Sequence, residues 1–219
     1  EIKAYVALHM GQLIRSPFKE TRFHFELLEV GDMEQTILLM LYPQEVIFQY
    51  ESLLQKVTLN PVSADISSLC LYRTILQQND LQQSPDKHVM VLQWSPVDHT
   101  IMVFHQNLPK FSRHSRLARL VDLWDVTKEG EWIWKDDQDS FEEAITDVLD
   151  VLERLLEFYR YSVMNGHGGV TDIFLTGDFP YLEKVREQLS QRFFLPIHIL
   201  QAFEEISSKF LPLYGLASK

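Results

Sequence analysis

Strand-like and helix-like segments alternate along this chain, and that alternation limits the fold more than any other feature. Short runs that are apolar at most positions, such as Thr36–Leu41 and Thr171–Thr176, are typical of buried strands. Elsewhere apolar residues recur at the three- and four-residue spacing of an amphipathic helix, as in residues 43–57. We therefore predict an α/β layered fold.

The individual elements follow from this periodicity and from proline, glycine and capping residues. Ser140, with Glu143 three residues later, is predicted to cap the longest helix as a Ser-x-x-Glu box, and Asn165 to Gly169 to end it. The polar stretch Gln77–Lys87 is the best linker candidate, because it holds one apolar residue in eleven. The predicted helices are 1–14, 43–57 with Pro43 in the first turn, 66–76, 141–164, one with Pro180 in its first turn, and a last one from about residue 201; the predicted strands are 23–27, 36–41, 171–176 and 195–200.

A β-hairpin or meander is predicted over residues 88–114. The apolar runs Val89–Leu92 and Thr100–Phe104 are joined by the turn-rich sequence of residues 95–98, and a further run begins after Asn107-Leu108-Pro109. Some nucleotide-binding folds hold phosphate with such a hairpin, through an acidic residue and a glycine at its first turn. Here Gln93 and Ser95 stand at those places.

Charge and composition exclude several classes of function. The formal charge of the 219 residues is −11, and no run is rich in lysine or arginine, which argues against a nucleic-acid partner. The lone Cys70 cannot form an internal disulfide and is interpreted as a small buried side chain. No apolar run reaches the roughly 18 residues that span a bilayer. Because the first residue is Glu1 and the sequence begins inside a helical pattern, we expect a piece of a longer protein.

The order of several motifs resembles the PilM family of bacterial type IV pilus assembly proteins. They are LNPVSADISSLCLYRTI at 59–75, the 88–113 hairpin, TDIFLTGDFPYLEKVREQLSQRFFLPIHIL at 171–200 and LYGLASK at 213–219. The resemblance implies an α/β actin/Hsp70-like (ribonuclease H-like) fold, related to the cell-division protein FtsA, with an incomplete N-terminal part and a small inserted subdomain. It divides the chain into part of that subdomain at 1–42, the helical part of the first lobe at 43–87, and the second lobe at 88–219.

The same resemblance implies a degenerate nucleotide site. The family's Asp-x-Gly maps to Gln93-Trp94-Ser95, and Pro96 after it has no N–H to donate. Of the glycines in the adenosine-contacting turn only Gly177 remains, before Asp178 and the bulky Phe179. Asp98 could supply a displaced carboxylate, but an aspartate that stabilises the turn is the preferred interpretation. We expect no catalytic residue, no cofactor and a pseudo-ATPase, with the first phosphate hairpin upstream of Glu1. The degenerate positions are Gln93, Ser95, Asp98, Thr100, Gly177 and Asp178.

Other residue groups favour structural over chemical roles. A metal site among His88, His99, His105 and His114 is conceivable, but no ligand spacing supports it, and we predict no metal. The acidic loop at 136–139 lacks the glycine and glutamate of a calcium loop. Residues 166–169 are interpreted as a helix stop, because no helix begins after them as a phosphate loop requires. The tryptophans at 124, 132 and 134, with Phe111, are interpreted as core residues and not as an exposed aromatic patch.

Two functions remain open. The first is a cytoplasmic scaffold, peripheral to the inner face of the cell membrane, in a pilus or related competence or secretion system. The resemblance implies that it binds the N-terminal peptide of a single-span PilN-type membrane protein in a groove walled by strand 36–41 and helix 46–57, with self-association as a further expectation. The second is an ATP-binding switch whose phosphate hairpin lies upstream. The residues expected near the groove are Leu39, Leu41, Tyr42 and Tyr50.

Overall fold

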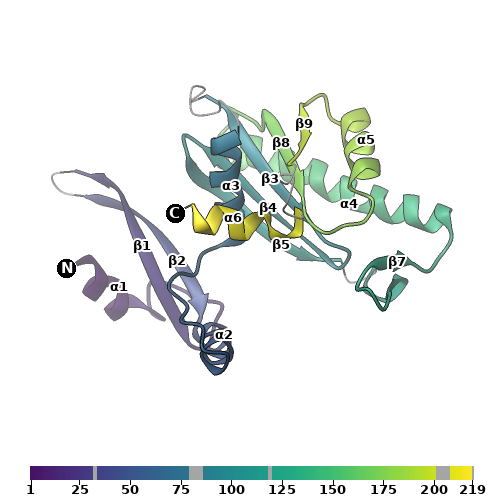
Figure 1. Cartoon of the computed structure of the whole chain (residues 1–219). Helices are drawn as coiled ribbons and strands as arrows, with labels where there is room; N and C mark the ends of the chain where they lie inside the picture. Colours follow the sequence, from purple (N-terminus) through teal and green to yellow (C-terminus); the bar gives the residue numbers. More distant parts are fainter. Residues whose placement is uncertain (32–33, 79–85, 118–119, 201–207, 219) are drawn as a thin grey trace. The chain divides into compact units, whose positions relative to one another are not determined.

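The computed structural model describes residues 1–31, 34–78, 86–117, 120–200 and 208–218. It forms two compact units, Glu1–Ala64 and Asp65–Lys219, whose elements are labelled in Figure 1. This division falls neither after residue 42 nor after residue 87, where the sequence analysis placed its boundaries. Most of the predicted linker at 77–87 lies outside the described residues.

The first unit is a β-hairpin with two helices. Strands β1 (Thr21–Val30) and β2 (Gln35–Pro43) pair antiparallel. Along the chain, α1 (Ile2–His9) precedes them and α2 (Gln44–Lys56) follows them. The predicted strands and the helix after Pro43 are therefore confirmed, although α2 begins one residue after Pro43, and the helix predicted over 1–14 is confirmed only as far as His9. The prediction that strand 36–41 is buried is wrong, because Met40 is the only residue of β2 that is fully buried. A two-stranded sheet in a unit this small has little structure to cover it.

The second unit is built on a five-stranded mixed sheet of order β5-β4-β3-β8-β9. The first three strands of the unit form the predicted antiparallel meander, and β8 and β9 run parallel to β3. Among the described residues the strands of this sheet are β3 (His88–Trp94), β4 (Asp98–His105), β5 (Leu108–Arg116), β8 (Asp172–Thr176) and β9 (Ile197–Ile199), and the helices of the unit are α3 (Ser67–Gln78), α4 (Gln138–Phe158), α5 (Leu182–Arg192) and α6 (Leu211–Ala217).

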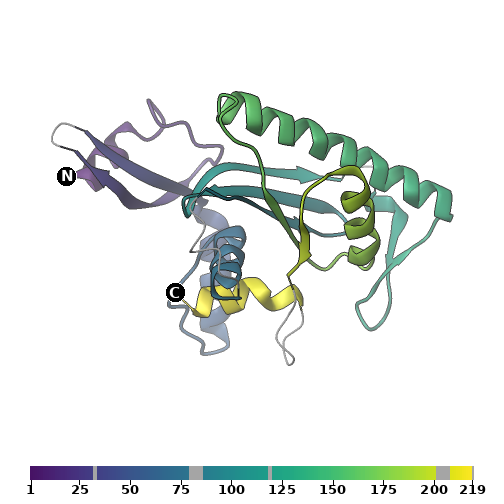
Figure 2. The same cartoon turned by 90° about the horizontal axis from the view of Figure 1, so that it is seen from above.

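Both faces of this sheet are covered, which explains why its central strands are apolar at nearly every position. In β3, Met90, Leu92 and Trp94 join the larger core with α4 and α5, while Val89 and Val91 join a second core with α3. Figure 2 shows α4 on one side of the sheet and α3 and α6 on the other. The alternation of side chains thus places one apolar core on each face of the sheet.

A short segment between β5 and α4 carries the aromatic residues that the sequence analysis singled out. It consists of η2 (Val121–Leu123), β6 (Trp124–Val126) and β7 (Trp132–Trp134). Trp124 is buried, and Trp132 and Trp134 pack against the larger core. Trp124 and Trp134 meet edge to face at 5.1 Å. The interpretation as core packing is confirmed.

The ends of α4 show one correction and one confirmation. Asp137, not Ser140, is the N-cap residue, and its carboxylate accepts a hydrogen bond from the backbone N–H of Ser140 at 2.8 Å. At the other end the helix continues as a π-helical turn, η3 (Tyr159–Val163), and stops where Asn165 and Gly166 take positive φ values of 51° and 79°. That stop is the predicted one.

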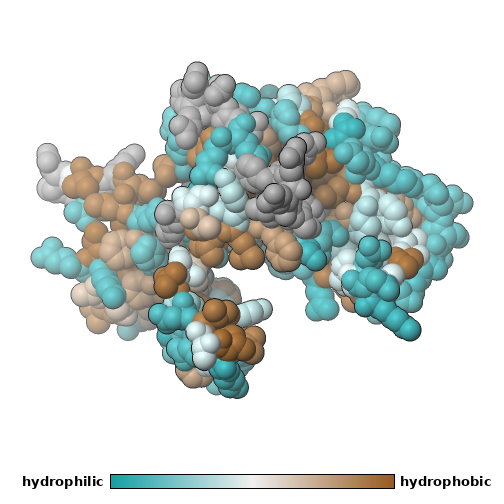
Figure 3. Space-filling model, in the orientation of Figure 1, coloured by the Kyte–Doolittle hydropathy of each residue, from teal (hydrophilic) through white to brown (hydrophobic). Residues whose placement is uncertain are grey.

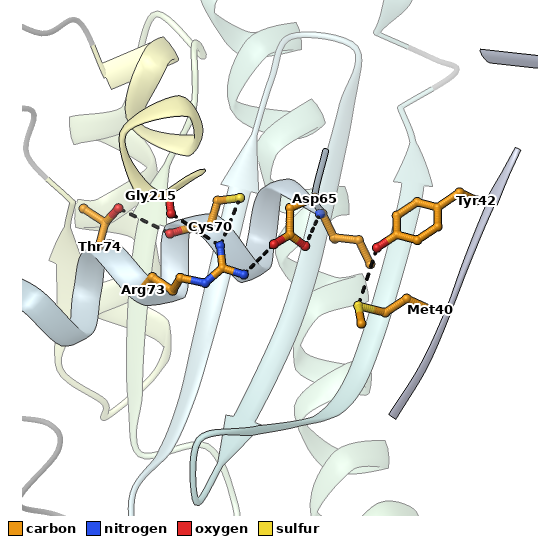
Figure 4. Close-up of polar contacts among 8 residues, drawn as sticks. Met40, Tyr42, Asp65, Cys70, Arg73, Thr74 and Gly215 are labelled. Carbon is orange, nitrogen blue, oxygen red and sulfur yellow. Dashed lines mark hydrogen bonds and ion pairs between the residues drawn. The ribbon is translucent and has the colours of Figure 1, made fainter. Parts of the chain in front are cut away.

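Close packing joins α3 to the C-terminal helix. Gly215 of α6 lies so near α3 that an added Cβ would be 1.9 Å from the carbonyl oxygen of Cys70. Arg73 donates to the Gly215 carbonyl at 3.3 Å and forms a 2.5 Å ion pair with Asp65 (Figure 4). Cys70 is buried in this contact, as predicted. The η4 turn (Ser208–Phe210) precedes α6. The position near residue 201, where the last helix was predicted to begin, lies outside the described residues.

Candidate functional site

The turn between β3 and β4 is held together by its own side chains. The backbone N–H of Ser95 donates to the Asp98 carbonyl at 2.9 Å, and the Ser95 hydroxyl donates to the Asp98 carboxylate at 3.0 Å. The same hydroxyl accepts from the backbone N–H groups of Val97 and Asp98. Asp98 thus stabilises the turn, as in the structural interpretation of this residue.

Gln93 and Thr100 face each other across β3 and β4 on the side of the sheet that α3 covers. The Gln93 side-chain oxygen accepts a hydrogen bond from the Ser67 hydroxyl of α3 at 3.1 Å. Thr100 is bonded to His114 on β5 through its hydroxyl and Nδ1, 3.0 Å apart. The Gln93 side-chain oxygen and the Thr100 hydroxyl therefore each have a protein partner. Ser67 was not predicted, and no local signal marks it, because the contact depends on how α3 docks.

Gly177 makes the closest backbone approach of the site. Its φ is +127°, and an added Cβ would lie 2.0 Å from the carbonyl oxygen of Trp94. Two residues later, the N–H of Phe179 donates to the same oxygen at 3.3 Å, and the Phe179 ring is buried. Glycine is needed here to bring the chain after β8 against the end of β3.

A small cavity brings together three of the six predicted positions. Its volume is about 160 Å³, and Gln93, Gly177 and Asp178 line it together with Thr176 and Lys209. The Thr176 hydroxyl is buried without a hydrogen-bond partner. Ser95, Asp98 and Thr100 are not among its lining residues. Thr176 and Lys209 were not predicted; the end of a buried strand is the signal that could have indicated Thr176.

These residues do not fit a magnesium nucleotide. The amide of Gln93 has no charge to hold a hydrated cation, and the carboxylate of Asp98 is used by Ser95. The cavity is smaller than the 300–1,000 Å³ of a typical small-molecule site. The residues around Gln93 and Gly177 therefore provide few groups that could hold a phosphate or a metal ion.

The four histidines near the hairpin do not converge on one point. His88 is hydrogen bonded through Nδ1 to the Tyr159 hydroxyl at 2.8 Å and stacks on His105 at 3.9 Å. His114 bonds to Thr100, and His99 is buried with neither ring nitrogen bonded. Burial, followed by the charges of His114 and Arg113, lowers the pKa of His99 to about 4. No group of three potential metal ligands lies among the described residues.

The residues expected to bind a partner lie in the first unit. Leu39 and Leu41 share one face of the hairpin with their pairing partners Phe25 and Phe23, and all four are half-buried. Tyr42 points to the opposite face and donates to the Met40 sulfur at 3.5 Å (Figure 4). The structure thus groups Leu39 with Leu41 but not with Tyr42.

Helix α2 adds exposed apolar side chains to this unit. Tyr50 is 64 % exposed, and Val46 and Leu53 on the same helix are also exposed. Apolar residues are visible over the first unit in Figure 3. An ion pair of 3.0 Å between Arg22 and Glu51 connects α2 to β1. The unit therefore presents considerable apolar surface.

A comparison with solved structures identifies the fold. A chain of the PilM-PilN type IV pilus biogenesis complex matches with a TM-score of 0.74 at 17% identity, covering 99% of this chain and 71% of that one. The fold is the actin-like fold of PilM. The fold that the resemblance implied is thus confirmed over nearly the whole chain.

Other comparisons add little. A protein of unknown function from Bacteroides thetaiotaomicron, with an actin-like ATPase fold, matches with a TM-score of 0.47 at 12% identity, covering 100% of this chain and 66% of that one. No protein-family model and no curated protein matches the sequence. None of the helices in the described part of the chain is long and apolar enough to cross a membrane.

Proposed function

We propose that this chain is a non-catalytic scaffold of a type IV pilus, or related competence or secretion, assembly platform. It binds the N-terminal segment of a PilN-type single-span membrane protein at the inner face of the cell membrane. The observation that carries the proposal is the match over 99% of the chain to a component of a PilM-PilN complex. Function resides in sites and not in folds, so the proposal depends on the surface of the first unit.

The apolar face that contains Leu39 and Leu41 supports a peptide-binding role. The side chains on this face of the β1–β2 hairpin are only half-buried, and α2 adds the exposed Tyr50 to the same unit. An extended segment gains affinity by burying apolar anchors against such a surface and specificity by pairing with backbone groups. Tyr42 lies on the other face of the hairpin and has a smaller part in this proposal.

Substitution of Leu41 by aspartate is expected to weaken peptide binding at least about tenfold, because a carboxylate replaces an apolar contact. The measurement is a fluorescence titration of a labelled peptide from the cytoplasmic N-terminus of a PilN-type partner. Leu13→Asp is the matched control, since Leu13 is exposed in the same unit but lies outside the hairpin. Tyr50→Ala, which leaves the strand unchanged, should also weaken binding. Equal affinities for all four proteins would contradict the proposal.

The alternative function is an ATP-binding switch, and the nucleotide site argues against it. We expect this chain to bind Mg-ATP no more tightly than about 1 mM, roughly −4 kcal/mol, because Gln93 and Pro96 replace groups that hold metal and phosphate. Isothermal titration calorimetry measures this directly. A dissociation constant in the low micromolar range would favour the switch over the pseudo-ATPase scaffold.

A further inference from the structure

Strand β5 has one side unpaired. It is the terminal strand of the order β5-β4-β3-β8-β9, and no described strand pairs with its outer side. In an edge strand, every second residue turns its backbone N–H and C=O outward, where they can pair with an added strand. Over Leu108–Arg116 only Pro109 lacks an N–H. The backbone of β5 is therefore a long template for strand addition.

The same strand is basic in an acidic protein. Lys110, Arg113 and Arg116 are exposed, and the strand contains no acidic residue, whereas the whole chain has a net charge of −11. None of the three forms an ion pair with a described residue. Arg113 only donates to the Ser115 hydroxyl, at 3.2 Å. This local positive charge favours an acidic ligand over a basic one.

A cavity of about 760 Å³ opens beside this edge, between the outer strands and α4. Arg113 and Ser115 of β5 line one side, and Leu120, Ala144 and Val148 give it apolar walls. His99 lines it as well and is 2 % exposed, with neither ring nitrogen hydrogen bonded. A volume of this size accommodates several side chains, and the unpaired imidazole is a polar group that a ligand could satisfy.

Strand alternation fixes which side chains of a ligand would meet the cavity. Phe111, Arg113 and Ser115 of β5 face the side of α4, whereas His114 and Arg116 share the face of Thr100. A strand added to β5 would place alternate side chains on these two faces. On the α4 side the cavity has apolar walls at Leu120, Ala144 and Val148, so apolar residues belong on that face.

We propose that the β5 edge and its adjoining cavity bind an extended acidic segment of a partner protein, with apolar residues at alternate positions. The apolar residues enter the cavity beside α4. The acidic residues lie on the opposite face, which carries Arg116, and the charges of Lys110 and Arg113 on the same strand add to the attraction. This site is in the second unit, so it is separate from the peptide site proposed on the β1–β2 hairpin.

The probe is a labelled octapeptide of alternating glutamate and valine, titrated against the 219-residue chain by fluorescence anisotropy. Saturable binding is expected, with a dissociation constant of about 100 μM or lower. Arg113→Glu combined with Arg116→Glu should weaken it at least about tenfold, whereas the control Lys128→Glu, at an exposed turn, should change it less than about twofold. Ala144→Trp, which fills the cavity, should also weaken binding, while Leu41→Asp should not.

Two modified peptides test the recognition mode. N-methylation at every residue removes all the N–H groups that could pair with β5 and should abolish binding. Replacement of every glutamate by lysine should abolish it as well. Equal binding of either peptide would overturn the proposal, as would equal effects of the Arg113/Arg116 reversal and Lys128→Glu, or no binding at all.

A second copy of this chain is the competing occupant of the edge. Sedimentation of the wild-type chain and of the Arg113/Arg116 reversal over a range of concentrations distinguishes it. A dimer that the reversal abolishes, in a chain that does not bind the Glu-Val peptide, would overturn the acidic-segment proposal. A monomer that binds the peptide supports it.

Discussion

Gly177→Ala is expected to lower the free energy of unfolding of the second unit by at least about 3 kcal/mol. Two costs combine at this residue. The φ of +127° is one that residues with a side chain rarely adopt, and the new methyl group would lie 2.0 Å from the Trp94 carbonyl oxygen. Relief requires the ends of β3 and β8 to separate, which would also disturb the hydrogen bond from Phe179 to the same oxygen.

Gly166→Ala is the matched control for this substitution. Gly166 also has a positive φ, +79°, but an added Cβ there has no neighbour within 4 Å. Its cost should be only the backbone strain of about 1 kcal/mol. Urea unfolding followed by tryptophan fluorescence measures both variants, because all four tryptophans lie in the second unit. Equal losses in the two variants would show that the close approach to Trp94 contributes nothing.

Acidification is expected to destabilise the second unit through His99, by about 3 kcal/mol between pH 7 and pH 4. Burial, with smaller contributions from His114 and Arg113, lowers the pKa of His99 from 6.5 to about 4 in the folded chain. Between these two values the unfolded chain binds a proton that the folded chain does not. The contribution of the neutral His99 to the free energy of unfolding is therefore fully present above pH 6.5 and is lost as the pH falls toward 4.

The difference between wild type and His99→Phe isolates this effect, because phenylalanine has a similar shape and does not titrate. The wild-type chain should lose stability relative to the variant as the pH falls from 6.5 to 4, when both are unfolded in urea at each pH. His167→Gln is the control, since it removes a histidine that is exposed. A flat curve for His99→Phe would mean that the imidazole titrates normally in the folded state.

The elements that the sequence predicted well are those set by local chemistry. The meander at 88–114, strand 171–176 and the glycine stop after α4 were confirmed because apolar runs, turn residues and positive-φ residues act over a few positions. The cap of α4 was predicted wrongly for a related reason. Asp137 and Ser140 are both good N-cap residues three positions apart, and the local sequence does not decide at which of them the helix begins.

The candidate site was predicted only in part. Gln93, Gly177 and Asp178 do line one cavity. The sequence did not indicate that Ser67 donates a hydrogen bond to the Gln93 side-chain oxygen, or that Lys209 lines the same cavity. These contacts join segments distant along the chain. Periodicity and turn chemistry contain no information about them, because they depend on how the helices dock on the sheet.

By itself the sequence determined the order of strands and helices and the residue types at the nucleotide positions, since both are properties of short segments. The mapping of Gln93 and Ser95 onto positions that handle phosphate comes from the family resemblance and stays a prediction. Only the tertiary structure decided that Asp98 holds a turn, that His99 is buried without a partner, and that β5 forms a basic edge beside a cavity. Burial and edge position arise from the packing of distant segments, which no local pattern specifies.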